Sequence, residues 1–256
     1  MTFVKPKKHL GQHFLKDENI AVKIVDSLDD KSVNILEIGA GMGVLTKYLI
    51  QKPGVNLFVM DIDRDSVDYM KQHYPELGDR LILGDFLQYM PDMLFKDNFS
   101  VIGNFPYNIS SQILFKVLEH RNQICEVIGM FQDEVAKRIA AKSGSKTYGI
   151  LSVLLQAYYH IEYLFKVNET VFSPPPKVKS AVIRLRRNDV ASLDCDEKLF
   201  KLIVKTAFNQ RRKTLRNALK GIAIDKQYTS QELFGKRAEQ LNVSDFVKIT
   251  QYAAKE

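Results

Sequence analysis

Glycines and one acidic residue occur together in Glu37-Ile-Gly39-Ala-Gly41-Met-Gly43, directly after the apolar run Val33-Asn-Ile-Leu. Glycines in a turn between a strand and a helix let a ligand touch the backbone. Val44 stands three residues after Gly41, so the GxGxxG spacing of a pyrophosphate site is absent. An acidic residue at position 37 favours a ligand with positive charge, such as the amino group and sulfonium of S-adenosylmethionine. The alternative is a tight turn that binds nothing.

Two further carboxylates follow the next two apolar runs. Asp61 ends Leu57-Phe-Val-Met and lies 22 residues past Gly39, where a carboxylate can bind two ribose hydroxyls. Asp85 follows the third run, where it can accept a hydrogen bond from the adenine amino group of the cofactor. Asp63 and Asp65 are better explained by helix capping and by favourable charge near a helix amino terminus.

The fourth apolar run, Ser100-Val-Ile-Gly, ends in Asn104-Phe105-Pro106-Tyr107, and this motif indicates the methyl acceptor. An amine conjugated to an aromatic base is a poor nucleophile until its N–H groups are hydrogen-bonded. The Asn104 side-chain oxygen can accept one such bond. Pro106 restrains the preceding residue and can aim the Phe105 carbonyl at the same nitrogen. Tyr107 offers a face for stacking the base, although a simple turn would also explain the motif.

A basic segment lies between residues 205 and 220. Its six basic residues are Lys205, Arg211, Arg212, Lys213, Arg216 and Lys220, and the segment contains no acidic residue. It therefore carries six of the net seven positive charges of the chain. Such a stripe predicts contacts to RNA phosphates, and the alternative is a solvated helix face.

The elements that position these residues follow an α/β pattern over residues 33 to 185, in which short apolar runs alternate with amphipathic ones. Strands are expected at Val33 to Ile38, Leu57 to Ile62, Arg80 to Leu83, Ser100 to Gly103, Glu126 to Met130, Ile161 to Val167 and Val178 to Leu185. Helices are expected at Val44 to Gln51, Arg64 to Tyr74, Ser110 to Glu119, Gln132 to Lys142 and Ile150 to Ala157. We expect a Rossmann-like sheet whose last two strands form an antiparallel hairpin at one edge.

A domain boundary is expected near residue 188, because charged and turn-forming residues there give way to helical spacing alone. The chain then divides into a Rossmann-like domain with a basic amino-terminal arm (residues 1–187) and a helical RNA-binding domain (residues 188–256). Helices are expected at Glu197 to Phe208, Arg212 to Lys220, Ser230 to Phe234 and Val243 to Ala253. The first of these would bury Leu199, Leu202, Ile203 and Ala207.

Composition excludes several classes of protein. The 256 residues include 37 Lys plus Arg and 30 Asp plus Glu, for a net charge of +7, and 45% are hydrophobic, as in a globular protein. No apolar run approaches the length of a membrane span, and the amino terminus does not read as a secretion signal. Cys125 and Cys195 have no metal-ligand spacing, so we expect no metal site and a cytoplasmic location.

The chain resembles the ribosomal small-subunit RNA adenine N6,N6-dimethyltransferases over nearly its whole length. The resemblance rests on Lys8-His-Leu-Gly-Gln-His-Phe-Leu15, Glu37 to Thr46, Asn104 to Ser110, Phe172-Ser-Pro-Pro-Pro-Lys-Val178, and Phe208-Asn-Gln-Arg-Arg-Lys-Thr-Leu-Arg-Asn217. It implies transfer of methyl groups from S-adenosylmethionine to N6 of two neighbouring adenosines near the 3′ end of 16S rRNA.

The resemblance also assigns roles to individual residues. It implies that the cofactor contacts His13, Leu15, Gly39, Asp61, Asp85 and Asn104. It further implies that Phe172 faces Tyr107 across the target base, whereas Phe172 could otherwise fill a gap in the core. Two residues depart from the family pattern: Asp61 is commonly Glu and His13 is often Asn, and both departures bear on cofactor affinity.

Three rival functions remain open from the sequence. A DNA adenine methyltransferase would share the Asn104 motif but would need a larger target-recognition region. A large-subunit RNA dimethylase would share the catalytic half, and the segment Phe208 to Asn217 argues for the small-subunit branch. The chain could also act mainly as an assembly factor on the pre-ribosomal 30S particle. We expect a monomer that binds small-subunit rRNA.

Overall fold

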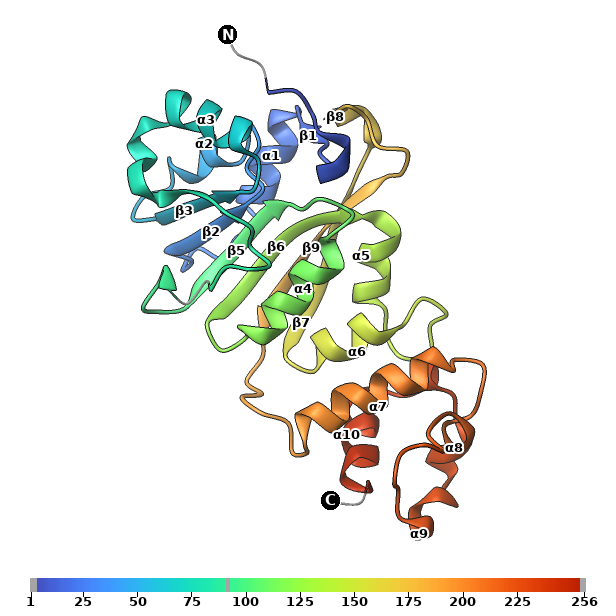
Figure 1. Cartoon of the computed structure of the whole chain (residues 1–256). Helices are drawn as coiled ribbons and strands as arrows, with labels where there is room; N and C mark the ends of the chain where they lie inside the picture. The colour runs from blue at the N-terminus through green and yellow to red at the C-terminus, as the bar shows by residue number, and fades with distance from the viewer. Residues whose placement is uncertain (1–3, 91–92, 254–256) are drawn as a thin grey trace. The chain divides into compact units, whose positions relative to one another are not determined.

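The computed structural model describes residues 4–90 and 93–253, which cluster into two compact units. The first unit comprises residues 4–136 and 160–187 and contains a seven-stranded mixed sheet of order β4-β3-β2-β5-β6-β9-β7 (Figure 1). Its strands are β2 (Asn34–Ile38), β3 (Asn56–Asp61), β4 (Leu81–Leu83), β5 (Phe99–Asn104), β6 (Ile124–Gln132), β7 (Tyr159–Val167) and β9 (Ser180–Arg187). The seven predicted strands are confirmed, and their ends shift by a few residues.

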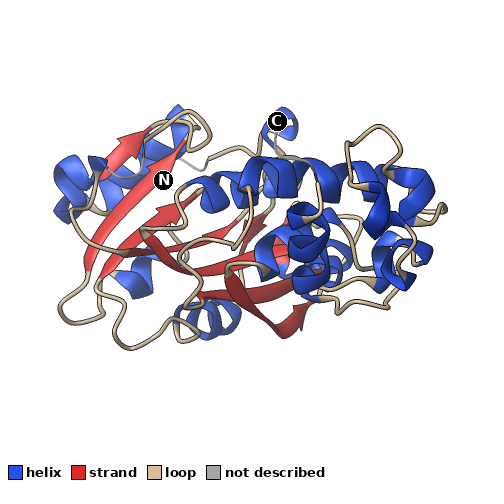
Figure 2. Cartoon of the chain, turned by 90° about the horizontal axis from the view of Figure 1, so that it is seen from below, coloured by secondary structure: helices blue, strands red, loops and turns tan. Residues whose placement is uncertain are grey.

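The first five strands of this sheet are parallel, so their carboxyl ends meet at one edge. β9 runs antiparallel to β6, and β7 lies outermost beside β9, which places the last two strands at one sheet edge as predicted. β2, β5 and β6 are buried along almost their whole length because helices cover both faces of the sheet (Figure 2). The covering helices are α1 (Glu18–Val25), α2 (Thr46–Leu49), α3 (Arg64–His73), α4 (Ser110–Glu119) and α5 (Asp133–Ala140).

The amino-terminal arm contains structure that the sequence analysis did not predict. The two-residue strand β1 (Phe14–Leu15) pairs antiparallel with β8 (Phe172–Ser173). Helix α1 follows, capped by Asp17, whose side chain accepts hydrogen bonds from the backbone N–H groups of Asn19 and Ile20. The capping aspartate was readable from the sequence, whereas a two-residue strand is too short to show an alternating pattern.

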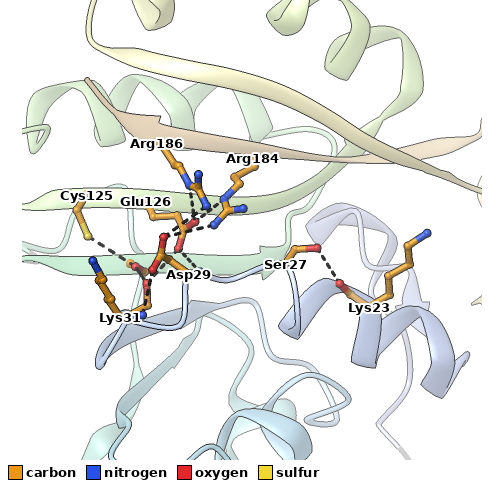
Figure 3. A network of polar contacts seen from close by, with 10 residues as sticks. Lys23, Ser27, Asp29, Lys31, Cys125, Glu126, Arg184 and Arg186 are labelled. Carbon is orange, nitrogen blue, oxygen red and sulfur yellow. Dashed lines mark hydrogen bonds and ion pairs between the residues drawn. The ribbon is translucent and has the colours of Figure 1, made fainter. Parts of the chain in front are cut away.

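The amino ends of the central strands are joined by a buried polar network (Figure 3). Glu126 accepts hydrogen bonds from Arg184 Nε (2.6 Å), the Asp29 backbone N–H (3.0 Å) and Ser32 Oγ (3.0 Å). These three donors compensate the negative charge of the buried Glu126 carboxylate. The network fixes the sheet at the end opposite to the predicted site.

The second unit comprises residues 137–159 and 188–253 and is helical. Its helices include α6 (Ile150–Gln156), α7 (Glu197–Asn209), α8 (Leu215–Ala218), α9 (Lys226–Thr229) and α10 (Val243–Gln251). Residues 137–159, expected in the first domain, cluster here because Gly144 N donates to the Glu239 carbonyl and Tyr148 packs against Phe208.

Three predictions for this unit were wrong in detail. The expected helix from Arg212 to Lys220 is only four residues long, because Thr214 is extended and bridges Arg237. The expected helix at Ser230 to Phe234 is a 3-10 turn at Glu232–Gly235. Helix α7 buries Phe200, Ile203, Val204 and Ala207, whereas Leu202 is 53% exposed.

No helix within the described ranges is long and apolar enough to cross a membrane.

Candidate active site

A cavity opens at the carboxyl ends of β2 to β5 and brings together most of the predicted site residues. Those that line it are His13, Gly39, Gly41, Asp61, Asp85, Asn104, Phe105, Pro106 and Tyr107. A smaller neighbouring cavity is lined by Leu15 and Glu37 and shares Gly39 and Asn104 with the first. The parallel arrangement of the strands explains why residues from positions 37 to 107 meet at one edge.

The turn after β2 requires glycine. Gly39 and Gly41 have φ values of 74° and 56°, which side chains rarely adopt. A Cβ on Gly41 would lie 2.8 Å from the Phe14 ring, so the turn and the arm pack closely. The backbone of the turn is thereby exposed to the cavity without side chains in the way.

Asp61 holds this turn in place and is 5% exposed. Its Oδ2 accepts from the Gly41 N–H (2.9 Å) and its Oδ1 accepts from the Asp63 N–H (2.8 Å). Burial raises the pKa of Asp61 above its ordinary value, and the two backbone hydrogen bonds only partly oppose that shift. A buried carboxylate that lines the cavity is suited to accept hydrogen bonds from ribose hydroxyls.

Glu37 is 1% exposed and accepts a hydrogen bond of 2.5 Å from Thr46 Oγ1. Burial raises its pKa to about 8, and the nearby charge of Asp61 adds to the shift, while the bond from Thr46 opposes it. Glu37 is therefore mostly protonated at neutral pH in the free protein. A cation bound beside Glu37 would lower the pKa of this carboxyl group and favour its ionised form.

Asp85 lines the cavity from the loop after β4. Its carboxylate accepts from the Leu87 N–H (2.9 Å) and from Gln88 Nε2 (3.1 Å). These bonds fix its orientation at the sheet edge.

Asn104 ends β5, and its side-chain orientation is set by one contact. Asn104 Nδ2 donates to the His13 backbone carbonyl at 2.8 Å. A carbonyl can only accept, so the amide nitrogen must face His13 and Oδ1 is left to accept from another donor. This is the arrangement that polarisation of an adenine amine requires.

Phe105 is held in place by the packing of its ring. Phe105 is 1% exposed, and its ring packs edge-on against Phe131 at 5.3 Å between centroids. Gly103 and Gly129 leave room for it, since a Cβ on either would lie within 2.7 Å of the Phe105 ring. Burial of the ring anchors the motif at the edge of the cavity, which Phe105 lines.

Tyr107 is partly buried, and its hydroxyl lies 2.5 Å from Ser180 Oγ. Burial raises the pKa of this phenol, and the contact to Ser180 opposes the shift. The His13 ring stacks on the Tyr107 ring, with centroids 5.5 Å apart and an interplanar angle of 27°.

Phe172, predicted as the wall opposite Tyr107, does not line either cavity. It is 1% exposed, pairs with Leu15 across β1 and β8, and belongs to the hydrophobic core. The structure thus places Phe172 as core packing, the alternative that the sequence left open. The reason is the pairing of β8 with β1, which turns the ring inward.

The attachment of the amino-terminal arm is a feature that no sequence pattern predicted. Asp63 has a fully buried side chain that receives Lys7 Nζ (2.5 Å) and Gln12 Nε2 (2.9 Å). Burial alone would raise the pKa of Asp63, but the hydrogen bonds from Lys7, Gln12 and Asp65 N–H lower it. Lys7 also contacts Asp65 at 2.8 Å. These contacts join positions more than 50 residues apart, which no local pattern shows.

The predicted RNA-binding residues differ in their surroundings. Arg212, Lys213, Arg216 and Lys220 are exposed, as is Lys205 at the start of the segment. Arg211 instead donates to the Lys146 carbonyl (2.5 Å) and pairs with Glu239 at 3.4 Å. Arg216 Nε donates to the Thr229 carbonyl at 2.9 Å. Arg211 therefore has a structural role within the second unit.

Solved structures with a related fold include a dimethyladenosine transferase from Plasmodium falciparum, with a TM-score of 0.75 and 25% identity over 93% of this chain and 96% of that one. The 23S rRNA methyltransferase ErmE matches with a TM-score of 0.69 and 22% identity, over 93% of this chain and 99% of that one, which shows the fold alone.

Sequence comparisons identify nearer relatives. The chain is 58% identical to the ribosomal RNA small subunit methyltransferase A of Cytophaga hutchinsonii, over 98% of both chains. It is also 58% identical to that of Flavobacterium johnsoniae, over 98% of this chain and 97% of the relative. They bear out the expected reaction, S-adenosylmethionine-dependent dimethylation of adenine in 16S rRNA. The family description "Ribosomal RNA adenine dimethylase" matches residues 4–255. The chain therefore belongs to the ribosomal RNA adenine dimethylase family.

Proposed function

We propose that the cavity at the carboxyl edge of the sheet binds S-adenosylmethionine beside an adenine of small-subunit rRNA. The chain then methylates N6 of two adjacent adenosines near the 3′ end of that RNA. The observation that carries this proposal is the orientation of Asn104, whose amide nitrogen donates to the His13 carbonyl and whose oxygen is left to accept from an N–H group.

The residues of the cavity fit the cofactor. Gly39 and Gly41 present bare backbone, and a side chain on Gly41 would collide with Phe14. Asp61 binds the ribose hydroxyls, and Asp85 accepts from the adenine amino group. Glu37 supplies negative charge near the cationic end, while His13, Leu15 and Asn104 complete the wall. When bound, S-adenosylmethionine would supply a methyl group attached to a sulfonium sulfur, for which the neutral thioether is a good leaving group.

Asn104 and Phe105 prepare the acceptor. Their oxygens accept hydrogen bonds from the two N–H groups of the adenine N6, which draws the lone pair out of the ring. Pro106 fixes the Phe105 carbonyl, and Tyr107 stacks on the base. Positioning for in-line attack supplies much of the rate. The alkylated amine is acidic, so its proton can pass to water without a strong base.

In this proposal, the second unit binds the RNA. Its exposed cations Lys205, Arg212, Lys213, Arg216 and Lys220 contact phosphates, while Arg211 supports them through Lys146 and Glu239. The substrate is rRNA within the pre-ribosomal 30S particle, so the protein works in the cytoplasm during small-subunit assembly. We propose that it acts as a monomer.

Mass spectrometry tests the proposal directly. The protein is incubated with isotopically labelled S-adenosylmethionine and, in separate reactions, with small-subunit precursor particles that lack the modification, with large-subunit rRNA or with DNA. The expected product is N6,N6-dimethyladenosine at two neighbouring positions, with both methyl groups labelled. A label found only in large-subunit rRNA or in DNA would overturn the assignment of substrate.

A further inference from the structure

Tyr107, the residue proposed to stack on the target base, lies on the loop that joins β5 to α4. Ser110 Oγ donates to the Tyr107 carbonyl at 3.1 Å, which ties the backbone of this loop to the first turn of α4. A hydrogen bond to the backbone does not fix the ring, because the side chain still rotates about its own bonds. A ring that must meet a base at a defined angle needs a second point of attachment.

Ser180 supplies that attachment from the sheet. Its Oγ lies 2.5 Å from the Tyr107 hydroxyl oxygen, across 73 positions of the sequence. The hydroxyl is the end of the tyrosine side chain farthest from the backbone. Attachment at both ends therefore sets the direction in which the ring lies.

Ser180 is held at a defined place in the fold. It begins β9, is fully buried and pairs with Gln132 of β6. The Asp133 backbone N–H donates to the neighbouring Lys179 carbonyl at 2.9 Å. Ser180 is not among the described residues that line either cavity. Any effect of its side chain on the reaction must therefore pass through another residue.

The hydroxyl of Ser180 stands out in its surroundings. The next three residues of β9, Ala181, Val182 and Ile183, are buried and apolar. A buried hydroxyl costs free energy unless it is hydrogen-bonded, so a serine at this position requires a partner. In the structure that partner is Tyr107.

We propose that Ser180 is a positioning residue for methyl transfer, whose hydroxyl holds the Tyr107 ring at the angle that stacks on the target adenine. This inference rests on the proposed function. Without the bond the ring turns to other rotamers, and the base occupies the reactive position in fewer of the bound complexes. Phosphate contacts supply most of the RNA affinity, so the loss should appear in the rate and not in RNA binding.

A double-variant comparison tests this role. Ser180→Ala and Tyr107→Phe each remove one hydroxyl of the same bond. We expect each to lower the single-turnover methylation rate by about tenfold with RNA and cofactor saturating. The double variant should fall no further than either single variant, because the bond is already lost.

Binding measurements and a conservative variant separate positioning from a general loss of structure. Ser180→Ala should bind RNA and S-adenosylmethionine within about twofold of the parent affinities, so that the effect is confined to the rate. Ser180→Thr keeps the hydroxyl and should methylate within about threefold of the parent. The double-variant comparison does not depend on Ser180→Thr, whose added methyl group must fit a buried site.

Ser100 offers a matched control. It is also a fully buried serine on a strand, and its Oγ lies 2.8 Å from Ser32 Oγ, at the opposite edge of the sheet. Ser100→Ala should methylate at the parent rate even where its melting temperature falls.

Three results would overturn the inference. Methylation by Ser180→Ala at the parent rate would show that the bond does not position the ring. Losses that multiply in the double variant would mean that Ser180 acts independently of Tyr107. An equal loss in Ser100→Ala would mean that the rate follows any missing buried hydroxyl. The proposed function fails separately, if the parent protein itself transfers no methyl group to small-subunit rRNA.

Discussion

At the scale of single residues, burial decides the charge of Glu37 before a ligand arrives. A carboxyl group that is 1% exposed is held mostly neutral, because burial raises its pKa to about 8 and hydrogen bonding from Thr46 only partly opposes that shift. The amino group and sulfonium of S-adenosylmethionine favour the ionised form, so binding must release a proton below about pH 8.

This linkage predicts a pH dependence of cofactor binding. Affinity for S-adenosylmethionine should rise between about pH 6 and 8 by up to one log unit per pH unit. Glu37→Gln should flatten that slope and weaken binding at pH 8, as measured by calorimetry in buffers of different ionisation heat. Glu76→Gln, an exposed site outside the cavity, serves as the control. An unchanged slope in Glu37→Gln would remove Glu37 from the cofactor site.

The same shift has a cost in stability. A folded-state pKa above the ordinary 4.5 means that the stabilising contribution is present below pH 4.5 and is lost as pH rises through about 8. Glu37→Gln has no proton to lose, so the ligand-free variant should melt at least about 2 °C above the parent at pH 8. Scanning calorimetry at pH 5 and pH 8 checks this, because the gain should shrink at the lower pH.

Sequence reasoning found the residues that follow strands and missed those that depend on distant contacts. Gly39, Asp61, Asp85 and Asn104 were predictable because the carboxyl ends of parallel strands meet. The inward turn of Phe172 was not, since it depends on the pairing of β8 with β1. The contact of His13 with Tyr107 was hidden for the same reason.

At the scale of elements, the amino-terminal arm forms one wall of the site. The buried Asp63 holds this arm through contacts with Lys7 and Gln12. Asp63 caps α3 through the Asp65 N–H and also receives Lys7 and Gln12 from the arm. Residues 10–14 of that arm line the main cavity. Loss of the contacts between Asp63 and the arm should therefore weaken ligand binding at the site without unfolding the protein.

Asp63→Asn isolates these contacts, because asparagine keeps the helix cap and removes the charge that pairs with Lys7. We expect several-fold weaker cofactor binding, faster hydrogen exchange over residues 7–13 and little change in melting temperature. Lys7→Ala should reproduce the effect, and the double variant should add little to either. Lys8→Ala is the neighbouring control. Additive effects of the two substitutions would show that the pair does not act together.

Elements that carry a complete pattern were predicted well, as Ser110–Glu119 illustrates, where both ends match. The helix expected at Arg212 to Lys220 failed because a tertiary contact, the bridge between Thr214 and Arg237, outweighs local propensity. Residues 137–159 follow the sheet in sequence but pack with the C-terminal helices. Such packing depends on partners about 60 to 100 residues away and has no local signal.

At the scale of the whole molecule, the net charge of +7 is concentrated in the segment proposed to hold RNA. Because Arg211 and Arg216 are tied to backbone carbonyls, the clean test uses Arg212, Lys213 and Lys220. Their replacement by Ala should flatten the slope of log RNA affinity against log salt by about two to three units. Cofactor binding and the methylation rate at saturating RNA should stay at parent levels.

A second triple variant controls for charge alone. Lys198, Lys226 and Lys248 are exposed in the same unit but lie outside the segment. Their replacement by Ala should change the slope less. Equal slopes for the two triple variants would mean that RNA follows the general charge of the protein and not this segment.

The central claim is that the Asn104 oxygen polarises the adenine amine, and the most direct measurement is single-turnover methylation by Asn104→Ala with cofactor and RNA saturating. Asn56→Ala, at the amino end of β3, controls for loss of an amide. We predict a rate at least about 10²-fold below the parent, with RNA still bound. A folded Asn104→Ala protein that methylates at the parent rate would contradict the account.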